Sequence, residues 1–235
     1  MKILALDSSG LTASVALAED DNLIAEYTIQ YKKTHSQTLL PMLEEIRRMV
    51  ELDLSTVDAI AVAAGPGSFT GLRIGSATAK GLALAMEKPI VPVPTVDGLA
   101  YQLYGTDALV CPIMDARRSQ VYTGIYEFVF DKERYDMHVI REQCAVSFDE
   151  IAEALNQLNR KVIFLGDGVP VFRERMTEVM RAPYTLAPSH RNRQSAASIA
   201  ALGSLYYRQG RIESGAEHAP EYLRLSQAER ERGKI

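Results

Sequence analysis

Several sequence features that mark common enzyme classes are missing from this chain. It has no tryptophan and only two cysteines, Cys111 and Cys144, which lie in apolar, strand-like contexts without C-x-x-C spacing. Such contexts favour reduced core thiols over a disulfide or a metal site. The four histidines are scattered, and neither an H-E-x-x-H nor an H-x-x-x-H pattern occurs. The G-x-S-x-G elbow and the G-x-x-x-x-G-K-[ST] loop are also absent, so the sequence gives no support to these hydrolase and nucleotide-binding classes.

Long apolar runs and a strong charge excess are missing as well. No stretch approaches the apolar length that spans a bilayer, and the first residues form a strand pattern rather than a charged leader. A net charge of -4 argues against a generally basic nucleic-acid surface. With 235 residues, 47% of them hydrophobic, the chain has material for one large domain or two small ones. We therefore expect a soluble, cytoplasmic protein that does not bind membranes.

The stretch 65–75, Gly-Pro-Gly-Ser-Phe-Thr-Gly-Leu-Arg-Ile-Gly, organises the rest of the sequence. An apolar, β-branched strand pattern precedes it, and a helical pattern over 72–86 follows. Ser68 stands where a helix N-cap belongs, and Gly65 and Gly67 permit positive φ on either side of a proline. The pattern predicts a strand, a sharp turn and a helix. Such a turn either binds an anion on free backbone N–H groups or is only a tight turn, and the sequence leaves both open.

The helix that follows this turn is poor in bulky side chains. Small residues recur every four positions and form one stripe along it, so another backbone can come close. Two interpretations stay open: the helix is internal to the fold, or it meets a partner. As a hypothesis, this helix and a preceding one that opens at Thr34 form the surface for a partner chain or for a second copy. The residues of this hypothesis are Gly71, Gly75, Ala79 and Ala83, with Leu39, Leu43 and Ile46 beside them.

Two segments carry the S/T-x-x-E/Q pattern of a capping box, which predicts a helix start. Thr34 and Gln37 would open one helix, and Ser147 and Glu150 would open another. Pro41 lies within the first of these helices and should bend its first turns, because proline removes one backbone hydrogen bond.

The order of the predicted elements repeats once along the chain. Three strands are followed by helix, strand, helix, strand and helix, first in residues 1–105 and again in 106–229, before a charged tail at 230–235. One strand in each half ends in an aspartate, Asp7 and Asp115. Two β-β-β-α-β-α-β-α halves with an acidic hairpin in each resemble the α/β, ribonuclease H-like fold of the actin-like ATPases. Strand-end aspartates are also ordinary turn formers, and that alternative stays open.

Resemblance to the actin-like ATPases implies a nucleotide cleft between the halves. The hairpins that begin at Asp7 and Asp115 would approach the phosphates and magnesium, and a glycine pair would face the base. The residues so implied are Asp7, Ser8, Ser9, Gly10, Asp115, Gly166, Asp167 and Gly168.

Four motifs resemble the TsaB (YeaZ) family, and the resemblance covers nearly the whole chain. They are the stretch 65–75, Asp115-Ala-Arg-Arg-Ser-Gln-Val-Tyr122, Thr34-His-Ser-Gln37 ahead of Leu40-Pro41, and Pro220-Glu-Tyr-Leu-Arg224. The resemblance implies a bacterial protein of threonylcarbamoyladenosine formation on tRNA, a paralogue of the catalytic subunit TsaD that pairs with it. It also implies that the ATPase TsaE joins the pair, that tRNA is met through the complex, and that the protein alone forms a homodimer.

One departure from TsaD bears on catalysis. TsaD carries H-x-x-x-H metal ligands just after the strand that corresponds to residues 89–93, and here Thr95 and Leu99 occupy those positions. Neither side chain holds a catalytic metal as histidine does. The resemblance therefore implies a non-catalytic subunit with a degenerate nucleotide cleft, no metal and no cofactor of its own, and ATP or ADP binding only in the complex. The alternative is an autonomous ATP-dependent phosphotransferase of the actin-like class, which the two aspartate hairpins favour.

Overall fold

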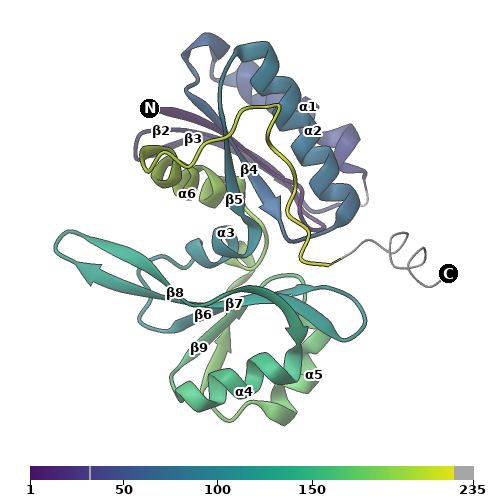
Figure 1. The fold of residues 1–235 in the computed structure, drawn as a ribbon, viewed down its shortest axis with the longest axis vertical. Coiled ribbons are helices and arrows are strands. Elements are labelled where there is room, and N and C mark those ends of the chain that lie inside the picture. Colours follow the sequence, from purple (N-terminus) through teal and green to yellow (C-terminus); the bar gives the residue numbers. More distant parts are fainter. Residues whose placement is uncertain (32, 225–235) are drawn as a thin grey trace.

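Two five-stranded sheets follow one another along the long axis of the molecule (Figure 1). The computed structural model describes residues 1–31 and 33–224. In the first sheet the order is β3-β2-β1-β4-β5, with β2 antiparallel to both neighbours and β4 and β5 added in parallel. Its strands are β1 Lys2–Asp7, β2 Ala13–Glu19, β3 Asn22–Ile29, β4 Ala59–Gly65 and β5 Ile90–Pro94.

The second sheet repeats this topology in the order β10-β9-β6-β7-β8. Strand β6 takes the central place of β1, β7 and β8 continue from it in antiparallel fashion, and β9 and β10 are parallel to it. Strands β7 and β8 form a long hairpin that projects from the body (Figure 1). The strands are β6 Leu109–Asp115, β7 Gln120–Asp131, β8 Arg134–Ser147, β9 Val162–Leu165 and β10 Tyr184–Leu186. The predicted duplication is confirmed, and the fold is that of the actin-like, ribonuclease H-like proteins.

The helices follow the predicted order in each half. Helices α1 and α2 lie side by side on one face of the first sheet, and α4 and α5 cover one face of the second (Figure 1). Among residues 1–31 and 33–224, none of the helices is long and apolar enough to cross a membrane. The helices are α1 His35–Met49, α2 Phe69–Met86, α3 Thr95–Tyr101, α4 Phe148–Leu158, α5 Val169–Val179 and α6 Ala196–Arg208, with short 3-10 turns at Leu54–Thr56 and Ser189–Arg191.

The helix that ends each half of the sequence packs against strands of the other half. Helix α6 covers the face of the first sheet opposite α1 and α2, where Ile199 and Leu202 pack on β1, β4 and β5. Helix α3 lies between the sheets, and its Val96 and Leu99 pack with Tyr126 of β7. The boundary at residue 105 thus separates the strands of the two sheets, but the assignment of all of 106–229 to the second half is wrong for α6. Packing of an apolar helix face is long-range, and the linear order of elements does not reveal it.

Strand β1 shows why both faces of the first sheet are covered. Its Leu4 and Leu6 point into the core beneath α1 and α2, and its Ile3 and Ala5 point into the core beneath α6. A strand covered on both faces is apolar at successive positions rather than at alternate ones. The central strands β1 and β4 therefore hold the first half together from inside.

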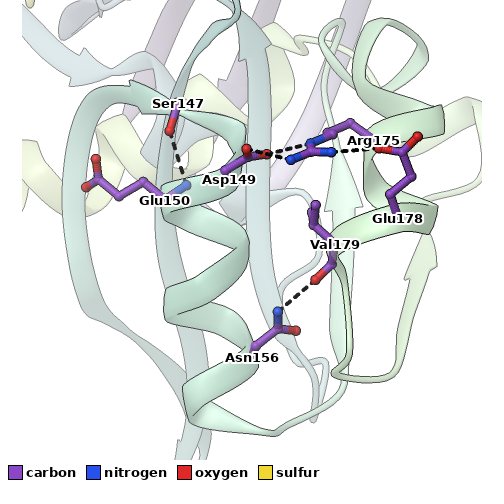
Figure 2. A network of polar contacts seen from close by, with 7 residues as sticks. All are labelled: Ser147, Asp149, Glu150, Asn156, Arg175, Glu178 and Val179. Carbon is purple, nitrogen blue, oxygen red and sulfur yellow. Dashed lines mark hydrogen bonds and ion pairs between the residues drawn. The ribbon is translucent and has the colours of Figure 1, made fainter.

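Two of the three predicted helix caps form. The Ser68 hydroxyl accepts a hydrogen bond from the Gly71 N–H at 3.3 Å. The Ser147 hydroxyl accepts one from the Glu150 N–H at 3.2 Å (Figure 2). Thr34 stands at the N-cap of α1, but its side chain makes no cap hydrogen bond, so the capping box predicted there is wrong. Its hydroxyl oxygen instead accepts a hydrogen bond from the Ser36 hydroxyl at 3.3 Å, and no backbone N–H of the helix donates to it.

Helix α6 receives its cap from a distant strand. Its own N-cap residue, Ser195, makes no side-chain cap bond. Instead Glu26 of β3 accepts hydrogen bonds from the Ala197 N–H at 3.1 Å and from the Ser195 hydroxyl at 2.7 Å. A carboxylate at a helix N-terminus satisfies free N–H groups and complements the helix dipole. This contact fixes α6 to the outer strand of the first sheet.

Helices α4 and α5 are joined by a polar network on their exposed side (Figure 2). The Arg175 guanidinium donates two hydrogen bonds, both of 2.8 Å, to the Asp149 carboxylate and a third of 2.7 Å to Glu178. The Asn156 amide donates to the Val179 carbonyl at 2.9 Å. Exposed ion pairs contribute about 0–1 kcal/mol each, so this network orients the two helices more than it stabilises them.

Candidate functional site

A cleft with a volume of about 780 Å³ lies where the two halves meet. All four motifs of the sequence analysis contribute to its wall, although they lie up to 190 residues apart in the chain. Its other walls come from the loop after β1, from the residue before the second of these motifs, from Asp167 after β9 and from the start of α5. Residues that line it include Ser9, Gly10, His35, Gly67, Ser68, Thr70, Asp115, Arg117, Arg118, Asp167, Tyr222 and Arg224.

The loop after β1, residues 7–12, is the first aspartate loop. Asp7 is 2% exposed, and its carboxylate accepts hydrogen bonds from the Ser9 hydroxyl at 2.6 Å and the Ser9 N–H at 2.9 Å. Burial raises the pKa of Asp7 to about 6, the Ser9 hydrogen bonds oppose that shift, and the negative charge of Asp167 adds to it. Asp7 is therefore a buried partner of its own loop, while Ser9 and Gly10 reach the cleft.

The glycines of the stretch 65–75 make room for this loop. A Cβ on Gly67 would lie 2.3 Å from the Ser9 carbonyl oxygen, and a Cβ on Gly71 would lie 2.1 Å from the Ser8 carbonyl oxygen. Gly65 has a φ of 124°, and its N–H donates to the Thr95 hydroxyl at 3.2 Å. The Ser68 N–H donates to the Ser9 carbonyl at 2.7 Å and the Gly71 N–H to the Ser68 hydroxyl at 3.3 Å, so three N–H groups of this turn are used inside the chain, which favours the tight-turn interpretation.

The small-residue stripe of α2 faces the molecule's own interior. Gly71 and Gly75 abut Ser8 of the first aspartate loop, and Ala79 and Ala83 lie in the core on the first sheet. Three further residues of the hypothesis, Leu39, Leu43 and Ile46, are 1%, 8% and 4% exposed in that same core. The hypothesis that these seven residues meet a partner is wrong, because all seven are buried against the first sheet or the first aspartate loop.

The faces of α1 and α2 that point to solvent carry other residues. On α2 these are Ala77, Gly81 and Leu84, which share one side of the helix, and Leu84 is 81% exposed. On α1, Leu40 is 55% exposed and Pro41 is exposed beside it. The two helices therefore present a second apolar and small-residue surface, which the four-residue stripe did not identify.

The loop after β6, residues 115–119, is the second aspartate loop. The Asp115 carboxylate accepts a hydrogen bond from the Arg117 N–H at 2.8 Å and pairs with the Arg117 guanidinium at 3.2 Å. Arg117, Arg118 and Ser119 have φ values of 64°, 56° and 57°. Residues other than glycine in this left-handed region cost about 1 kcal/mol or more each. Three in succession make this loop strained, and its two arginines line the cleft.

The segment 166–168 follows β9 and contributes one side chain to the cleft. Asp167 lines it, and burial raises the pKa of Asp167, as does the charge of Asp115, while backbone hydrogen bonds and Arg193 oppose the shift. A Cβ on Gly166 would lie 2.3 Å from the Ile113 carbonyl oxygen. A Cβ on Gly168 would lie 2.9 Å from that same oxygen. Close packing on β6 accounts for both glycines without a nucleotide base.

Thr95 and Leu99, at which the resemblance implied the metal-ligand positions of TsaD, lie in the core of this chain. Thr95 is fully buried, and its hydroxyl accepts the Gly65 N–H. Leu99 is 1% exposed and packs with Tyr126 and Val110. Both side chains therefore hold α3 in place between the sheets.

The C-terminal segment 213–224, here called the C-terminal strap, supplies cleft residues to which reasoning from the sequence assigned no role. It brings Glu221, Tyr222, Leu223 and Arg224 to the cleft wall. The only sequence signal was the motif at 220–224, which entered through resemblance. Contacts of this segment span more than 100 residues, so no local pattern could have placed it.

Fold and cleft together define a class: a duplicated actin-like protein whose first aspartate loop packs closely against its own helix α2. A model of the family TsaD, tRNA N6-adenosine threonylcarbamoyltransferase, matches residues 22–232. The tRNA threonylcarbamoyladenosine biosynthesis protein TsaB of Bacillus subtilis is 34% identical over 231 residues, 97% of this chain and 96% of that protein. Its counterpart in Haemophilus influenzae is 30% identical, covering 95% of this chain and 94% of that protein. The chain belongs to the TsaB (YeaZ) family.

The solved structures agree with that assignment. The structure of YeaZ from Pseudomonas aeruginosa superposes with a TM-score of 0.79 at 27% identity, covering 94% of this chain and 99% of that one. A second Pseudomonas aeruginosa structure, described as similar to peptidase YEAZ, gives a TM-score of 0.78 at 28% identity. The resemblance stated from the four motifs is therefore confirmed, and so is the fold that it implied.

Proposed function

We propose that this chain is a non-catalytic subunit of the bacterial complex that forms threonylcarbamoyladenosine on tRNA. It binds and supports the catalytic subunit TsaD, and the ATPase TsaE joins them in the cytoplasm. In this proposal tRNA is met through the complex, and the chain needs no cofactor of its own, with ATP or ADP binding only in the assembled complex. The names of its relatives support the pathway.

The observation that carries the non-catalytic assignment is the burial of Thr95 and Leu99. A metal-dependent transferase needs ligand side chains at these positions that converge on an open site. Here one side chain binds a backbone N–H and the other fills the core. Replacing either residue by histidine would have to break that packing first, which supports a subunit that kept the fold for assembly.

The partner surface in this proposal is the outer face of α1 and α2. Its residues are Leu40 and Pro41 of α1 with Ala77, Gly81 and Leu84 of α2, all of them exposed. Gly81 has no atom within 4 Å of the place where a Cβ would stand, so a partner helix can approach closely there. The same patch on two copies would give the two-fold homodimer of the protein alone.

The experiment that tests this function is reconstitution from purified parts. Modification of tRNA should require this chain, TsaD, TsaE, ATP and supplied threonylcarbamoyl-adenylate together. The chain alone should neither modify tRNA nor hydrolyse ATP at a useful rate. Turnover by this chain alone, lost in the Asp7→Ala variant, would overturn the proposal in favour of an autonomous actin-like phosphotransferase.

Leu84→Asp is expected to weaken binding of TsaD and of a second copy. The side chain is 81% exposed, so a charge there costs the monomer little but is desolvated at an interface. Affinity should fall by about tenfold or more, measured by sedimentation and calorimetric titration, with the unfolding temperature unchanged. The matched control is Phe130→Asp on the β7–β8 hairpin, an apolar residue that is 60% exposed and should leave both affinities unchanged. Equal affinity for wild type and Leu84→Asp would remove α2 from the interface.

A further inference from the structure

The C-terminal strap crosses from one half of the molecule to the other along the cleft. It begins as part of the first half, where Glu213 exchanges two backbone hydrogen bonds of 2.8 Å with Ile90 of β5. Next, Lys80 of α2 donates to the His218 carbonyl at 2.8 Å, and the buried His218 ring contacts Glu213 at 2.9 Å. In Figure 1 the strap runs beside α2 toward the junction of the halves.

Where the strap reaches the cleft, it packs on the turn before α2. The Glu221 N–H donates to the Ala64 carbonyl at 2.7 Å. A Cβ on Gly65 would lie 2.2 Å from the Glu221 carbonyl oxygen, so glycine is needed for the strap to come this close. The Tyr222 ring packs on Phe69 with centroids 4.8 Å apart. The first half therefore holds the strap by backbone bonds and by the packing of Tyr222 on Phe69.

Within the described part of the strap, Glu221 and Arg224 make hydrogen bonds to the second half. The Gln143 amide of β8 donates to the Glu221 carboxylate at 2.9 Å. Arg224 donates from one guanidinium nitrogen to the carbonyl oxygens of Ala116 and Arg117 in the second aspartate loop. These two carbonyls belong to the loop whose next residues have left-handed backbone. Arg224 thus binds the strained loop from the opposite half.

We propose that Arg224 and the C-terminal strap form a latch that holds the two halves together across the cleft and keeps the second aspartate loop in its left-handed conformation. Strained backbone persists only where surrounding contacts over-determine it. Inside the loop the contacts are the Asp115 bond to the Arg117 N–H and the bonds between residues 116, 117 and 120. From outside the loop, Asp167 accepts the Asp115 N–H at 3.4 Å at its start, and Arg224 donates to its carbonyl groups at 116 and 117. Release of the latch lets the loop relax and the cleft open.

This latch goes beyond the proposed function, because it is a property of the chain without any partner. It gives the cleft two states, one with the strap bound to both halves and one with the strap bound to the first half alone. The hydrogen bonds to the first half include three between backbone groups, whereas the hydrogen bonds to the second half come from the side chains of Glu221 and Arg224. Opening is therefore expected at the second half.

The test compares Arg224→Ala with wild type by hydrogen exchange and by a distance measurement. Amide exchange in residues 116–120 should rise about tenfold or more, as expected when local opening becomes easier. Spin labels at Leu11 and Val171, which are 65% and 62% exposed on opposite walls of the cleft, should move to longer and broader distances. Labelling uses a Cys144→Ser background, because Cys144 is half-buried and Cys111 is buried.

Two further variants keep the test decisive. Arg173→Ala removes an exposed arginine on α5 and should leave exchange and label distances as in wild type. Arg224→Lys keeps the positive charge but offers a point donor in place of the planar guanidinium, so exchange should be intermediate. If Arg224→Ala fails to fold, the same two measurements on Arg224→Lys decide. Wild-type exchange at 116–120 together with unchanged label distances, in whichever of the two variants folds, would overturn the latch.

Discussion

The two aspartate loops occupy equivalent places in the two halves but have different surroundings. The first is closed against α2, with Asp7 and Ser9 buried and three glycines shaped around its backbone. The second is open, with Arg117 83% exposed and three left-handed residues in a row. A duplicated fold thus preserves the position of a loop without preserving its role. Packing against α2 and the buried Asp7–Ser9 hydrogen bonds hold the first loop, and hydrogen bonds on an exposed surface hold the second.

Gly71→Ala should break the first loop and give the largest effect on stability. The added methyl would lie 2.1 Å from the Ser8 carbonyl oxygen. Because this is a backbone atom, no side-chain rotation can relieve the clash. Overpacking of this kind costs up to about 3 kcal/mol. Gly81→Ala, the same change on the same helix, adds a methyl in open space and should stabilise the fold by about 0.5–1 kcal/mol through helix propensity. Urea unfolding measures both, and equal effects would mean that α2 does not pack on the loop.

The order and type of the elements could be predicted from the sequence, because each depends on local pattern. The turn at 65–68, the caps at Ser68 and Ser147 and the duplicated order of strands and helices all follow from neighbouring residues. The side of α2 that faces the sheet could not be predicted. A stripe of glycine and alanine permits close approach by any backbone, and the loop that makes this approach lies 60 residues earlier in the chain.

The candidate site was predictable in its parts but not in its geometry. Four motifs pointed to functional segments, and all four line the cleft. Their mutual arrangement depends on long-range bonds such as Glu26 to α6 and Arg224 to residues 116 and 117. A single sequence does not report such pairs. Asp7 was expected among the nucleotide-binding residues and is instead buried. The sequence could not show this, because an aspartate at the end of a strand has the same sequence pattern whether its loop is open or closed.

Asp7→Asn should change how stability depends on pH, and the matching change in the second loop should not. The pKa of Asp7 is about 6 in the folded protein against a usual value of 3.8. A raised carboxyl pKa means that the folded state binds more protons than the unfolded state between these values, so stability falls as pH rises from about 4 to about 6. The difference corresponds to about 3 kcal/mol. Asparagine removes this cost of a buried charge, but its amide makes weaker hydrogen bonds than the carboxylate. The free energy of unfolding of the variant should therefore exceed that of wild type by about 2 kcal/mol at pH 8.

The measurement is urea unfolding of wild type and Asp7→Asn at pH 4.5 and pH 8. The difference between the two proteins isolates Asp7 from other buried acids such as Asp97, whose pKa burial also raises. Asp115→Asn is the matched change in the second loop, where the carboxyl side chain is 19% exposed, and should show no such gain at pH 8. Parallel pH profiles for wild type and Asp7→Asn would contradict the buried carboxyl.

Ser119→Gly should relieve strain in the second loop and give the smallest effect. Ser119 has a φ of 57° and an exposed side chain. Glycine adopts this backbone freely, which recovers about 1 kcal/mol, while its greater freedom in the unfolded chain removes about half of that. The expected gain is therefore about 0.5 kcal/mol, measured as a shift of the urea midpoint with an unchanged slope.

The same change in the first loop should have the opposite sign. Ser9→Gly deletes the 2.6 Å hydrogen bond to the buried Asp7 carboxylate and should cost about 1 kcal/mol or more. The two serine-to-glycine changes should thus alter the free energy of unfolding with opposite signs. Ser9 makes a buried hydrogen bond in the first loop, whereas Ser119 has strained backbone in the second. A loss of stability in Ser119→Gly would mean that the left-handed run is relaxed rather than strained, and that Arg224 binds a loop which needs no restraint.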